Sequence, residues 1–296
     1  MSQPPGSNTV GPMVSISSLT AHQLTSSTLD SLVEEINDKA AKMALWPWMA
    51  VLAVVSLLVA AGEWDNGLVA SFLSGVASIA ICMAAAWVYF WDTARRSTVL
   101  FYDLDPTSEQ AFSFLADGVG KLAGCGGKWR IDATGRVLDT KYHAGASSLV
   151  QRKPLQLGVG TFSKVKCNLD VPYIVVGSNT LYFCPDRLFM VTGGRVAAIG
   201  YDELTLRVGS TQFVESDSVP SDATIIGHTW QYVNKSGGPD RRFKNNRQLP
   251  VVRYDELFLT SVSGLVEVLQ FSRTGVANLF CQAAHPLISQ RRNRCP

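Results

Sequence analysis

Two long apolar runs near the amino end constrain this chain more than any other feature of its sequence. Residues 45–61 and 68–91 contain no Asp, Glu, Lys, Arg or His, and only residues 62–67 separate them. A helix rises about 1.5 Å per residue, so roughly 20 residues cross the hydrocarbon core of a bilayer. The second run is long enough, and the first becomes so when residues 43–44 join it. The pattern predicts a transmembrane helical hairpin over residues 43–91; the alternative is two helices buried in a soluble core.

The residues that flank the runs agree with a membrane and orient the hairpin. Amphipathic rings favour the headgroup level and stand towards the run ends; they are Trp46, Trp48, Trp64, Trp87, Tyr89 and Trp91. Lys39 and Lys42 precede the first run, and Arg95 and Arg96 follow the second. Lys and Arg beside a span mark its cytoplasmic side. We therefore expect a multi-pass protein with both termini in the cytoplasm and the lipid bilayer as its partner.

Small residues recur every four positions on the second run. They are Ala70, Ser74, Ser78, Cys82 and Ala86. In lipid, small side chains let two helix backbones approach closely. Two partners are possible: the first run, which offers Ala53, Ser56 and Ala60, or the same stripe on a second copy in a homo-oligomer. Neither run holds an ionisable residue of the kind that marks ion or proton paths, so we expect an anchor.

The rest of the chain divides by composition. Residues 1–27 are polar and rich in Ser, Thr, Gly and Pro, which is typical of a disordered cytosolic tail. Residues 28–42 carry apolar side chains at helical spacing behind a serine, which predicts an amphipathic helix. Residues 97–286 form a predicted cytosolic α+β domain, and residues 287–296 a basic tail.

Within residues 97–286, helical spacing is confined to two segments, 105–122 and 272–284. Outside these two segments, β-rich runs are separated by turn residues. The expected strands are 98–102, 129–131, 149–157, 165–169, 180–183, 187–191, 196–199, 204–208, 223–233, 251–259 and 265–271. Antiparallel strands closed by a C-terminal helix are the outline of a pleckstrin-homology-like domain or a small barrel. The number of strands and the first helix favour an elaborated α+β domain, mainly of antiparallel β structure.

Four stretches of this domain resemble a family of uncharacterised bacterial membrane proteins. They are Leu100–Asp105, Ala144–Val150, Thr180–Arg187 with the sequence TLYFCPDR, and Thr229–Pro250 with the sequence TWQYVNKSGGPDRRFKNNRQLP. The resemblance covers residues 97–285 and so concerns the domain, not the anchor. It implies a bacterial origin, hence the inner (plasma) membrane, and a domain attached to varied membrane segments. It implies no activity.

The last of these stretches holds the candidate site. Its seven polar and basic side chains are Lys235, Arg241, Arg242, Lys244, Asn245, Asn246 and Arg247, around a single acid, Asp240. Gly237 and Gly238 permit turns whose backbone amides receive an anion, and arginines can clamp a phosphate through two hydrogen bonds. The pattern indicates a loop that binds an anion, an anionic lipid or a protein partner. The alternative is a solvated loop between two strands, in which Asp240 pairs with one arginine.

Catalytic and metal chemistry has little support in the sequence. The six cysteines form no C-x-x-C pair and lack a histidine at ligand spacing, so no metal site is expected. His143, His228 and His285 stand apart, and no nucleotide-binding or hydrolase motif occurs. No catalytic residue and no cofactor are therefore predicted. With a net charge of +2, the chain lacks the broad positive surface of a nucleic-acid-binding protein.

These patterns together predict a membrane-anchored cytosolic binding or regulatory domain. Its partner would be an anionic ligand, a lipid headgroup or a protein. Two other classes remain open: a membrane-bound enzyme with an unrecognised site, and an effector that perturbs the bilayer when its cytosolic domain binds a signal.

Overall fold

A computed structural model describes residues 12–16, 18–19, 30–62, 68–136, 144, 146, 148–162 and 165–292. The chain divides into two compact units. The helical unit comprises residues 31–100 and 163–167, and the α+β unit comprises residues 1–30, 101–162 and 168–296. The predicted turn at residues 63–67 and most of the predicted tail over residues 1–27 lie outside the described residues.

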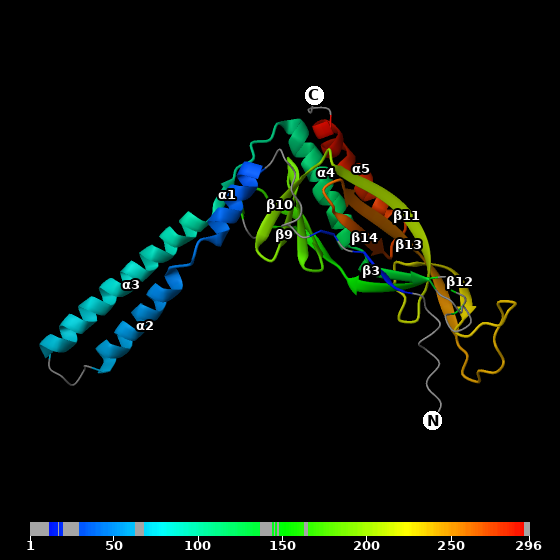
Figure 1. Cartoon of the computed structure of the whole chain (residues 1–296), viewed down its shortest axis with the longest axis horizontal. Coiled ribbons are helices and arrows are strands. Elements are labelled where there is room, and N and C mark those ends of the chain that lie inside the picture. The colour runs from blue at the N-terminus through cyan, green and yellow to red at the C-terminus, as the bar shows by residue number, and fades with distance from the viewer. Residues whose placement is uncertain are drawn as a thin grey trace. The chain divides into compact units, whose positions relative to one another are not determined.

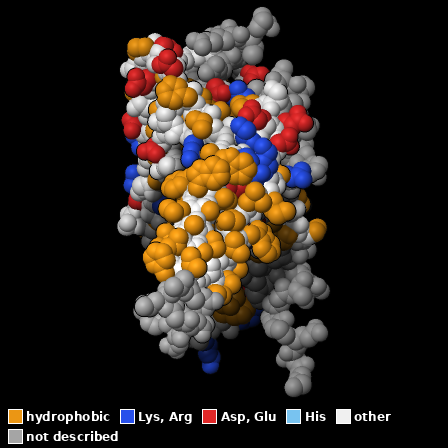
Figure 2. Space-filling view, turned by 90° about the vertical axis from the view of Figure 1, so that its left-hand side faces the viewer, with side chains coloured by type: hydrophobic (Ala, Val, Ile, Leu, Met, Phe, Trp, Pro, Cys, Tyr) orange, Lys and Arg blue, Asp and Glu red, His pale blue; other side chains and the backbone are white. Residues whose placement is uncertain are grey.

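Helices dominate the helical unit. Its elements are α1 (Asp30–Ala41), α2 (Trp46–Gly62), α3 (Leu68–Arg96) and the parallel strand pair β2 (Thr98–Leu100) and β6 (Val165–Cys167). The long helices α2 and α3 lie side by side (Figure 1). Figure 2 shows apolar side chains gathered on the surface of this pair. Two segments, residues 31–62 and 72–96, are long and apolar enough to cross a membrane by length and composition.

Small residues form the contact between α2 and α3. The Ser78 hydroxyl lies 3.0 Å from the carbonyl oxygen of Ser56 on α2 and 2.9 Å from that of Ser74. Ser78 and Ala53 are buried, whereas Ala86 is exposed. A step of four residues overshoots one helical turn by about 40°, so a stripe with this spacing winds around the helix. The intrachain partner predicted for the stripe is therefore observed at Ser78, and Ala86 lies outside the contact.

A carboxylate joins the two helices at their other end. Asp92 on α3 is 1% exposed. Its Oδ2 accepts the backbone N–H of Leu45, directly before α2, at 3.1 Å, and its Oδ1 accepts Arg95 Nη2 at 2.7 Å. Arg95 Nη2 also donates to the Met43 carbonyl at 2.9 Å. A negative charge thus caps the amino end of α2, where the helix dipole favours it.

In the described part of the α+β unit, two antiparallel sheets combine with two helices. The first sheet contains β1 (Val14–Ser15), β3 (Lys128–Arg136), β4 (Ser148–Pro154), β11 (Leu204–Val214), β12 (Thr224–Trp230), β13 (Gln248–Ser261) and β14 (Val266–Phe271). The second contains β5 (Gln156–Gly160), β7 (Val171–Val176), β8 (Asn179–Phe183), β9 (Arg187–Thr192) and β10 (Arg195–Gly200). The helices are α4 (Pro106–Ala123) and α5 (Val276–Arg292). The prediction of an α+β fold with mostly antiparallel sheets and a C-terminal helix is confirmed.

The core lies where the two helices meet the sheets. Helix α4 packs on β5 and β7, α5 packs on β11 and β13, and the helices pack on each other. A Cβ atom at Gly118 of α4 would lie 2.9 Å from the Cβ of Ala283 and 3.4 Å from Phe280 Cδ2, both on α5. The absence of a side chain at Gly118 therefore permits the close approach of the two helices.

A buried ion pair joins the first sheet across its strands. Its strands follow the order β4-β3-β14-β13-β11, yet Arg152 on β4 reaches Glu215, which follows β11, with Nη2 2.6 Å from Oε1. The Arg152 guanidinium also lies 4.3 Å from the ring centres of both Trp129 and Phe213. The Tyr254 hydroxyl donates to Glu215 Oε2 at 2.9 Å, and burial, together with that carboxylate, raises the pKa of Tyr254. The first and last strands of this order thus meet across the sheet.

The described ends of the chain differ from the sequence prediction. Val14 and Ser15, within the tail predicted to be disordered over residues 1–27, pair with Thr134 and Ala133 of β3. Helix α5 continues through Pro286 to residue 292, so the predicted basic tail over residues 287–296 begins inside a helix. The physical reason for this second difference is burial, because Leu287 packs in the core.

The strand β7 was also not predicted, since Pro172 interrupts its apolar run.

Replacing Arg152 with Ala should destabilise the α+β unit by about 3–5 kcal/mol, because Glu215 would remain buried without its partner. Lys153→Ala on the same strand is the matched control. Its ammonium group pairs with Asp132 at 2.6 Å but is 61% exposed, and such surface pairs contribute roughly 0–1 kcal/mol. Urea unfolding of the full chain in detergent, followed by circular dichroism, gives both values. Equal loss in the two variants would contradict the assigned role of Arg152.

Candidate anion-binding loop

The loop that carries the candidate residues joins β12 to β13 and is closed at its base by an asparagine. Asn246 Nδ2 donates to the carbonyl of Tyr232 at 2.7 Å, and its Oδ1 accepts the N–H of Tyr232 at 3.0 Å. Next to this pair, the N–H of Gln231 donates to the carbonyl of Arg247 at 2.9 Å. The Asn246 amide therefore acts as a peptide group would in a strand pair, and it extends the ladder of β12 and β13 into the loop.

A second asparagine shapes the first half of the loop. Asn234 Oδ1 accepts the backbone N–H groups of Ser236 at 2.9 Å and Gly238 at 2.8 Å. Gly237 between them has a φ of +80°, which glycine adopts at little steric cost. The backbone amides of Ser236 and Gly238 are thus already used within the chain. The N–H of Gly237 donates to the carbonyl of Asn234 at 3.1 Å, so the predicted reception of an anion by the amides of Gly237 and Gly238 loses both of them.

Two of the predicted arginines hold the loop together. Arg242 Nη2 lies 2.8 Å from Asp240 Oδ2, and its Nε lies 3.1 Å from Oδ1. Asp240 is buried, while the Arg242 side chain is 72% exposed. Arg247 donates from Nε to Gln231 Oε1 at 3.2 Å and from Nη2 to the Ser216 carbonyl at 3.3 Å. The Asp–Arg pair expected for a structural loop is therefore present.

Phe243 in the loop is held by an aromatic stack. The rings of Phe243 and Tyr232 are 4.0 Å apart between centres and inclined by 14°. Both residues are half-buried. One face of Phe243 is thus covered by the chain itself, and the loop is braced at this position as well as at Asn246 and Asp240.

The seven predicted site residues consequently divide into two groups. Arg242, Asn246 and Arg247 have partners within the chain, as given above. The other four, Lys235, Arg241, Lys244 and Asn245, are exposed, and in the described part of the chain none of them forms a hydrogen bond or an ion pair. We refer to Lys235, Arg241 and Lys244 as the exposed loop cations. They are positive charges on a braced loop, available to an external partner.

The four stretches that carry the family resemblance meet in pairs. The Tyr102 hydroxyl donates to Asp186 Oδ1 at 2.6 Å, which joins Leu100–Asp105 to Thr180–Arg187. Burial, together with Cys184 and Asp186, raises the pKa of Tyr102. Ala144, held at a φ of +54°, donates its N–H to the Gln231 carbonyl at 3.2 Å, and its carbonyl accepts the Thr229 hydroxyl at 2.9 Å. The second contact lies at the base of the candidate loop.

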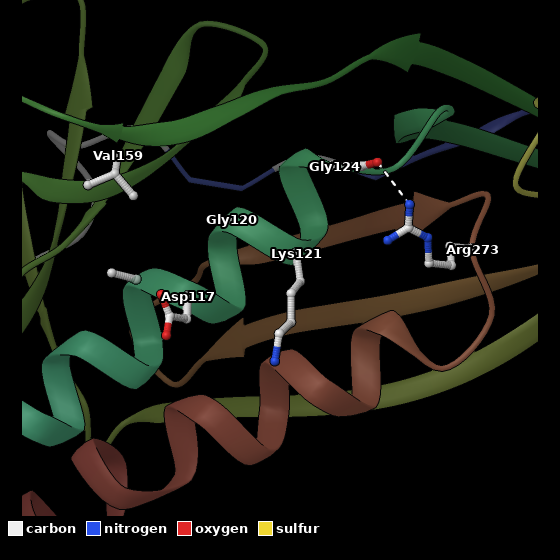
Figure 3. A pocket seen from close by; sticks show the side chains of 7 residues that line it. Asp117, Gly120, Lys121, Gly124, Val159 and Arg273 are labelled. Atoms are coloured by element: carbon white, nitrogen blue, oxygen red, sulfur yellow. Dashed lines mark hydrogen bonds between the residues drawn. The ribbon is translucent and has the colours of Figure 1, made fainter.

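An open depression beside α4 is a second candidate site (Figure 3). It is lined by Ala116, Asp117, Gly120, Lys121, Gly124, Val159 and Arg273. Arg273 donates to the Gly124 carbonyl at 3.1 Å, and its Nε lies 3.6 Å from Asp222 Oδ2. The charge of this arginine therefore offsets the partial negative charge at the C-terminal end of α4. The helix dipole at that end disfavours the binding of an anion. The depression is therefore a weaker candidate for anion binding than the exposed loop cations are.

Asp222 beside it has a structural role. Its carboxylate accepts the Ser272 hydroxyl at 2.6 Å and the N–H of Gly126 at 2.9 Å. Burial raises the pKa of Asp222, but these hydrogen bonds outweigh it and leave the pKa lowered. The charged form of Asp222 thus joins the loop after α4 to the start of the segment before α5.

The described residues offer little to a catalytic mechanism. No group of three or more His, Cys, Asp or Glu residues with the geometry of a metal site occurs among them. His228 lies on β12 and His285 on α5, both exposed, and His143 lies outside the described residues. Burial raises the pKa of the Cys125 and Cys281 thiols, which disfavours the reactive thiolate.

A scan against protein families, a search of curated proteins and a search of solved structures each found no match to this chain. The resemblance to a family of bacterial membrane proteins therefore stays a prediction. Function has to be inferred from the geometry of the chain itself.

Replacing Asn246 with Ala should loosen the loop, because two hydrogen bonds to Tyr232 are lost together. We expect amide hydrogen exchange over residues 232–246 to accelerate about tenfold or more, since each such bond contributes roughly 0.5–1.5 kcal/mol. Asn245→Ala is the matched control, because the neighbouring side chain has no partner among the described residues. Similar exchange in the two variants would rule out the closing role of Asn246.

Proposed function

We propose that α2 and α3 form a transmembrane hairpin in the bacterial inner membrane and anchor the α+β unit as a cytoplasmic binding domain. The exposed loop cations of this domain contact an anionic membrane surface. The observation that carries the anchor is the exposure of apolar side chains on both helices. The observation that carries the binding role is the set of three cations on a braced loop that have no partner among the described residues.

The exposure of the helix pair argues for lipid around it. On α2 and α3, the large apolar side chains that are at least half exposed are Trp48, Val51, Leu52, Val54, Val55, Leu57, Leu58, Val59, Phe72, Leu73, Val76, Ile79, Met83, Trp87 and Phe90. Soluble proteins rarely leave a continuous apolar surface of this kind open to water. The alternative of two helices buried in a soluble core requires a covering surface, and the two candidate spans are 0% and 6% buried.

Helix lengths and flanking charges fit the same proposal. The 17 residues of α2 cover about 25 Å, so residues 43–45 before it are needed to complete a span. The 29 residues of α3 exceed the roughly 20 that a bilayer requires, which leaves its end with Asp92, Arg95 and Arg96 outside the hydrocarbon core. Lys and Arg at this end favour a cytoplasmic position for both termini.

The anchor can be tested with the full chain in bacterial cells. We expect the chain to sediment with membranes, to resist extraction at alkaline pH and to be released by detergent. A fluorescent protein fused after residue 296 should fluoresce, and an alkaline phosphatase fused there should be inactive, because the carboxyl end is cytoplasmic. Recovery of the chain in the supernatant without detergent would refute the anchor.

The first sheet supports a barrel-like binding domain. The first and last strands of the order β4-β3-β14-β13-β11 meet at Arg152 and Glu215, and α5 packs on β11 and β13. This arrangement is consistent with a pleckstrin-homology-like barrel elaborated by α4 and a second sheet. In such a domain a loop between neighbouring strands is a natural position for ligand contacts, since a rigid scaffold holds it.

The chemistry of the exposed loop cations favours a surface over a small ligand. Lys235, Arg241 and Lys244 are exposed, whereas the cations with directional partners, Arg242 and Arg247, are used inside the chain. Exposed Lys and Arg near an anionic leaflet each contribute about 1 kcal/mol of attraction. Three of them would favour an anionic surface by about 3 kcal/mol, and the attraction would be screened by salt.

The loop is tested in nanodiscs that hold the full chain in neutral or in anionic phospholipid. We expect amide exchange over residues 235–245 to slow in anionic discs and to recover at high salt. Combining Lys235→Ala, Arg241→Ala and Lys244→Ala should abolish the difference, while Lys121→Ala, Arg195→Ala and Arg253→Ala, an equal change of charge at exposed positions, should preserve it. Inorganic phosphate added to neutral discs should give no protection.

Equal exchange in both lipids would overturn the lipid assignment. Protection by phosphate alone would point instead to a small-anion site. Neither outcome affects the anchor, which is tested separately by fractionation.

A further inference from the structure

An amino-terminal segment is docked on the first sheet by backbone and side-chain hydrogen bonds. We call residues 12–16 and 18–19 the amino-terminal strap. Besides the pairing of Val14 and Ser15 with β3, the N–H of Ile16 donates to the Asp132 carbonyl at 2.7 Å, and the N–H of Leu19 donates to the Gly264 carbonyl at 3.1 Å. The strap thus follows the edge of β3 and then the turn before β14.

A serine hydroxyl of the strap donates a hydrogen bond to a buried carboxylate. Ser18 Oγ lies 2.5 Å from Glu267 Oε1 and accepts the N–H of Val266 at 3.1 Å. Glu267 is 0% exposed, and its other oxygen, Oε2, accepts Arg130 Nε at 2.7 Å. One carboxylate oxygen is thus satisfied inside the sheet, while Oε1 accepts a longer bond from Arg130 Nη2 at 3.4 Å together with the hydroxyl of the strap.

A glycine provides the place for the next side chain. A Cβ atom at Gly264 would lie 2.9 Å from Leu19 Cγ and closer still to Leu19 Cδ1. The φ of Gly264 is +109°, a conformation that other residues rarely adopt. The turn therefore leaves a notch in which Leu19 rests against backbone.

The receiving surface is built into the sheet, but the strap itself is held lightly. Glu267 and its partner Arg130 lie in the sheet, whereas Met13, Val14 and Leu19 stay exposed. Docking therefore buries little apolar surface, and hydrogen bonds that each contribute roughly 0.5–1.5 kcal/mol must offset the entropy lost when the segment becomes ordered. A surface with defined contacts and a lightly held occupant can exchange that occupant for another of the same chemistry.

We propose that the edge of β3, the notch at Gly264 and the Glu267 carboxylate form a binding site for an extended peptide of a partner protein. Its ligand is a strand that carries a hydroxyl side chain followed directly by leucine. The strap occupies the site in cis and excludes the partner until it is displaced. Addition of a strand to a sheet edge supplies backbone hydrogen bonds, and the hydroxyl and leucine supply selectivity.

The site is tested on the full chain in detergent with a fluorescent peptide that has the sequence of residues 12–19. Binding measured by anisotropy should be at least tenfold tighter to the variant Ser18→Ala, Leu19→Gly than to the unaltered chain, because the weakened strap no longer competes. A peptide with alanine at the Ser18 position should bind about tenfold more weakly, since Glu267 loses a hydrogen bond to a charged group. A peptide of reversed sequence controls for composition.

The receiving surface is probed in the same variant. Adding Gly264→Ala should prevent peptide binding, whereas Val262→Ala in the same turn, at a side chain 91% exposed, should leave it unchanged. Binding of the reversed peptide with equal affinity, or no effect of Gly264→Ala, would overturn the proposal.

A second measurement needs no substitution. Excess peptide added to the unaltered chain should accelerate amide exchange in the chain's own residues 12–19 and leave β3 protected. Unchanged exchange at saturating peptide, together with no saturable binding to the weakened variant, would show that the site does not accept a strand in trans.

Discussion

The apolar surfaces of α2 and α3 impose the main constraint on this protein, because the described chain offers nothing to cover them. The contact between the two helices includes small residues such as Ser78 and Ala53. Trp46 and Tyr89 also meet edge to face between the helices, but many of the larger side chains stay exposed. In the proposed anchor a bilayer would cover these surfaces without further protein, and the charges would gather at one end, where Asp92 and Arg95 tie the helices together.

In the candidate loop, charge serves two purposes that composition alone does not separate. Arg242 and Arg247 are committed to internal partners and give the loop its shape, whereas Lys235, Arg241 and Lys244 are presented outward. The braces at Asn246, Asp240 and the ring of Phe243 reduce the entropy that the loop would lose on binding. Prior ordering of this kind strengthens a modest electrostatic attraction.

Much of the fold was predictable from local patterns, and the exceptions have physical causes. The two apolar runs and most strands were visible because charge-free stretches and β-rich runs between turn residues are local signals. The strand β7 was missed because Pro172 interrupts it. β1 has only two residues, and the contact of Ser18 with Glu267 spans 249 positions, so neither leaves a local pattern.

The candidate loop shows the same limit. Its position between two strands was predicted correctly, and the pair between Asp240 and one arginine belongs to the alternative interpretation of a solvated structural loop. Composition could not decide which arginine forms that pair, since both Arg241 and Arg242 lie within reach in sequence. The division of Asn245 and Asn246 into an exposed and a closing side chain depends on Tyr232, fourteen residues before Asn246.

The side-chain amide of Asn246, which closes the loop, is also a site of slow chemical change. Asparagine side chains hydrolyse slowly to aspartate and are among the thermolabile residues of proteins. Such a change would replace the nitrogen that faces the Tyr232 carbonyl with an oxygen, so that two acceptors would oppose each other across 2.7 Å. Aged protein would therefore include molecules in which the hydrogen bonds that close the loop are lost, although every basic side chain is intact.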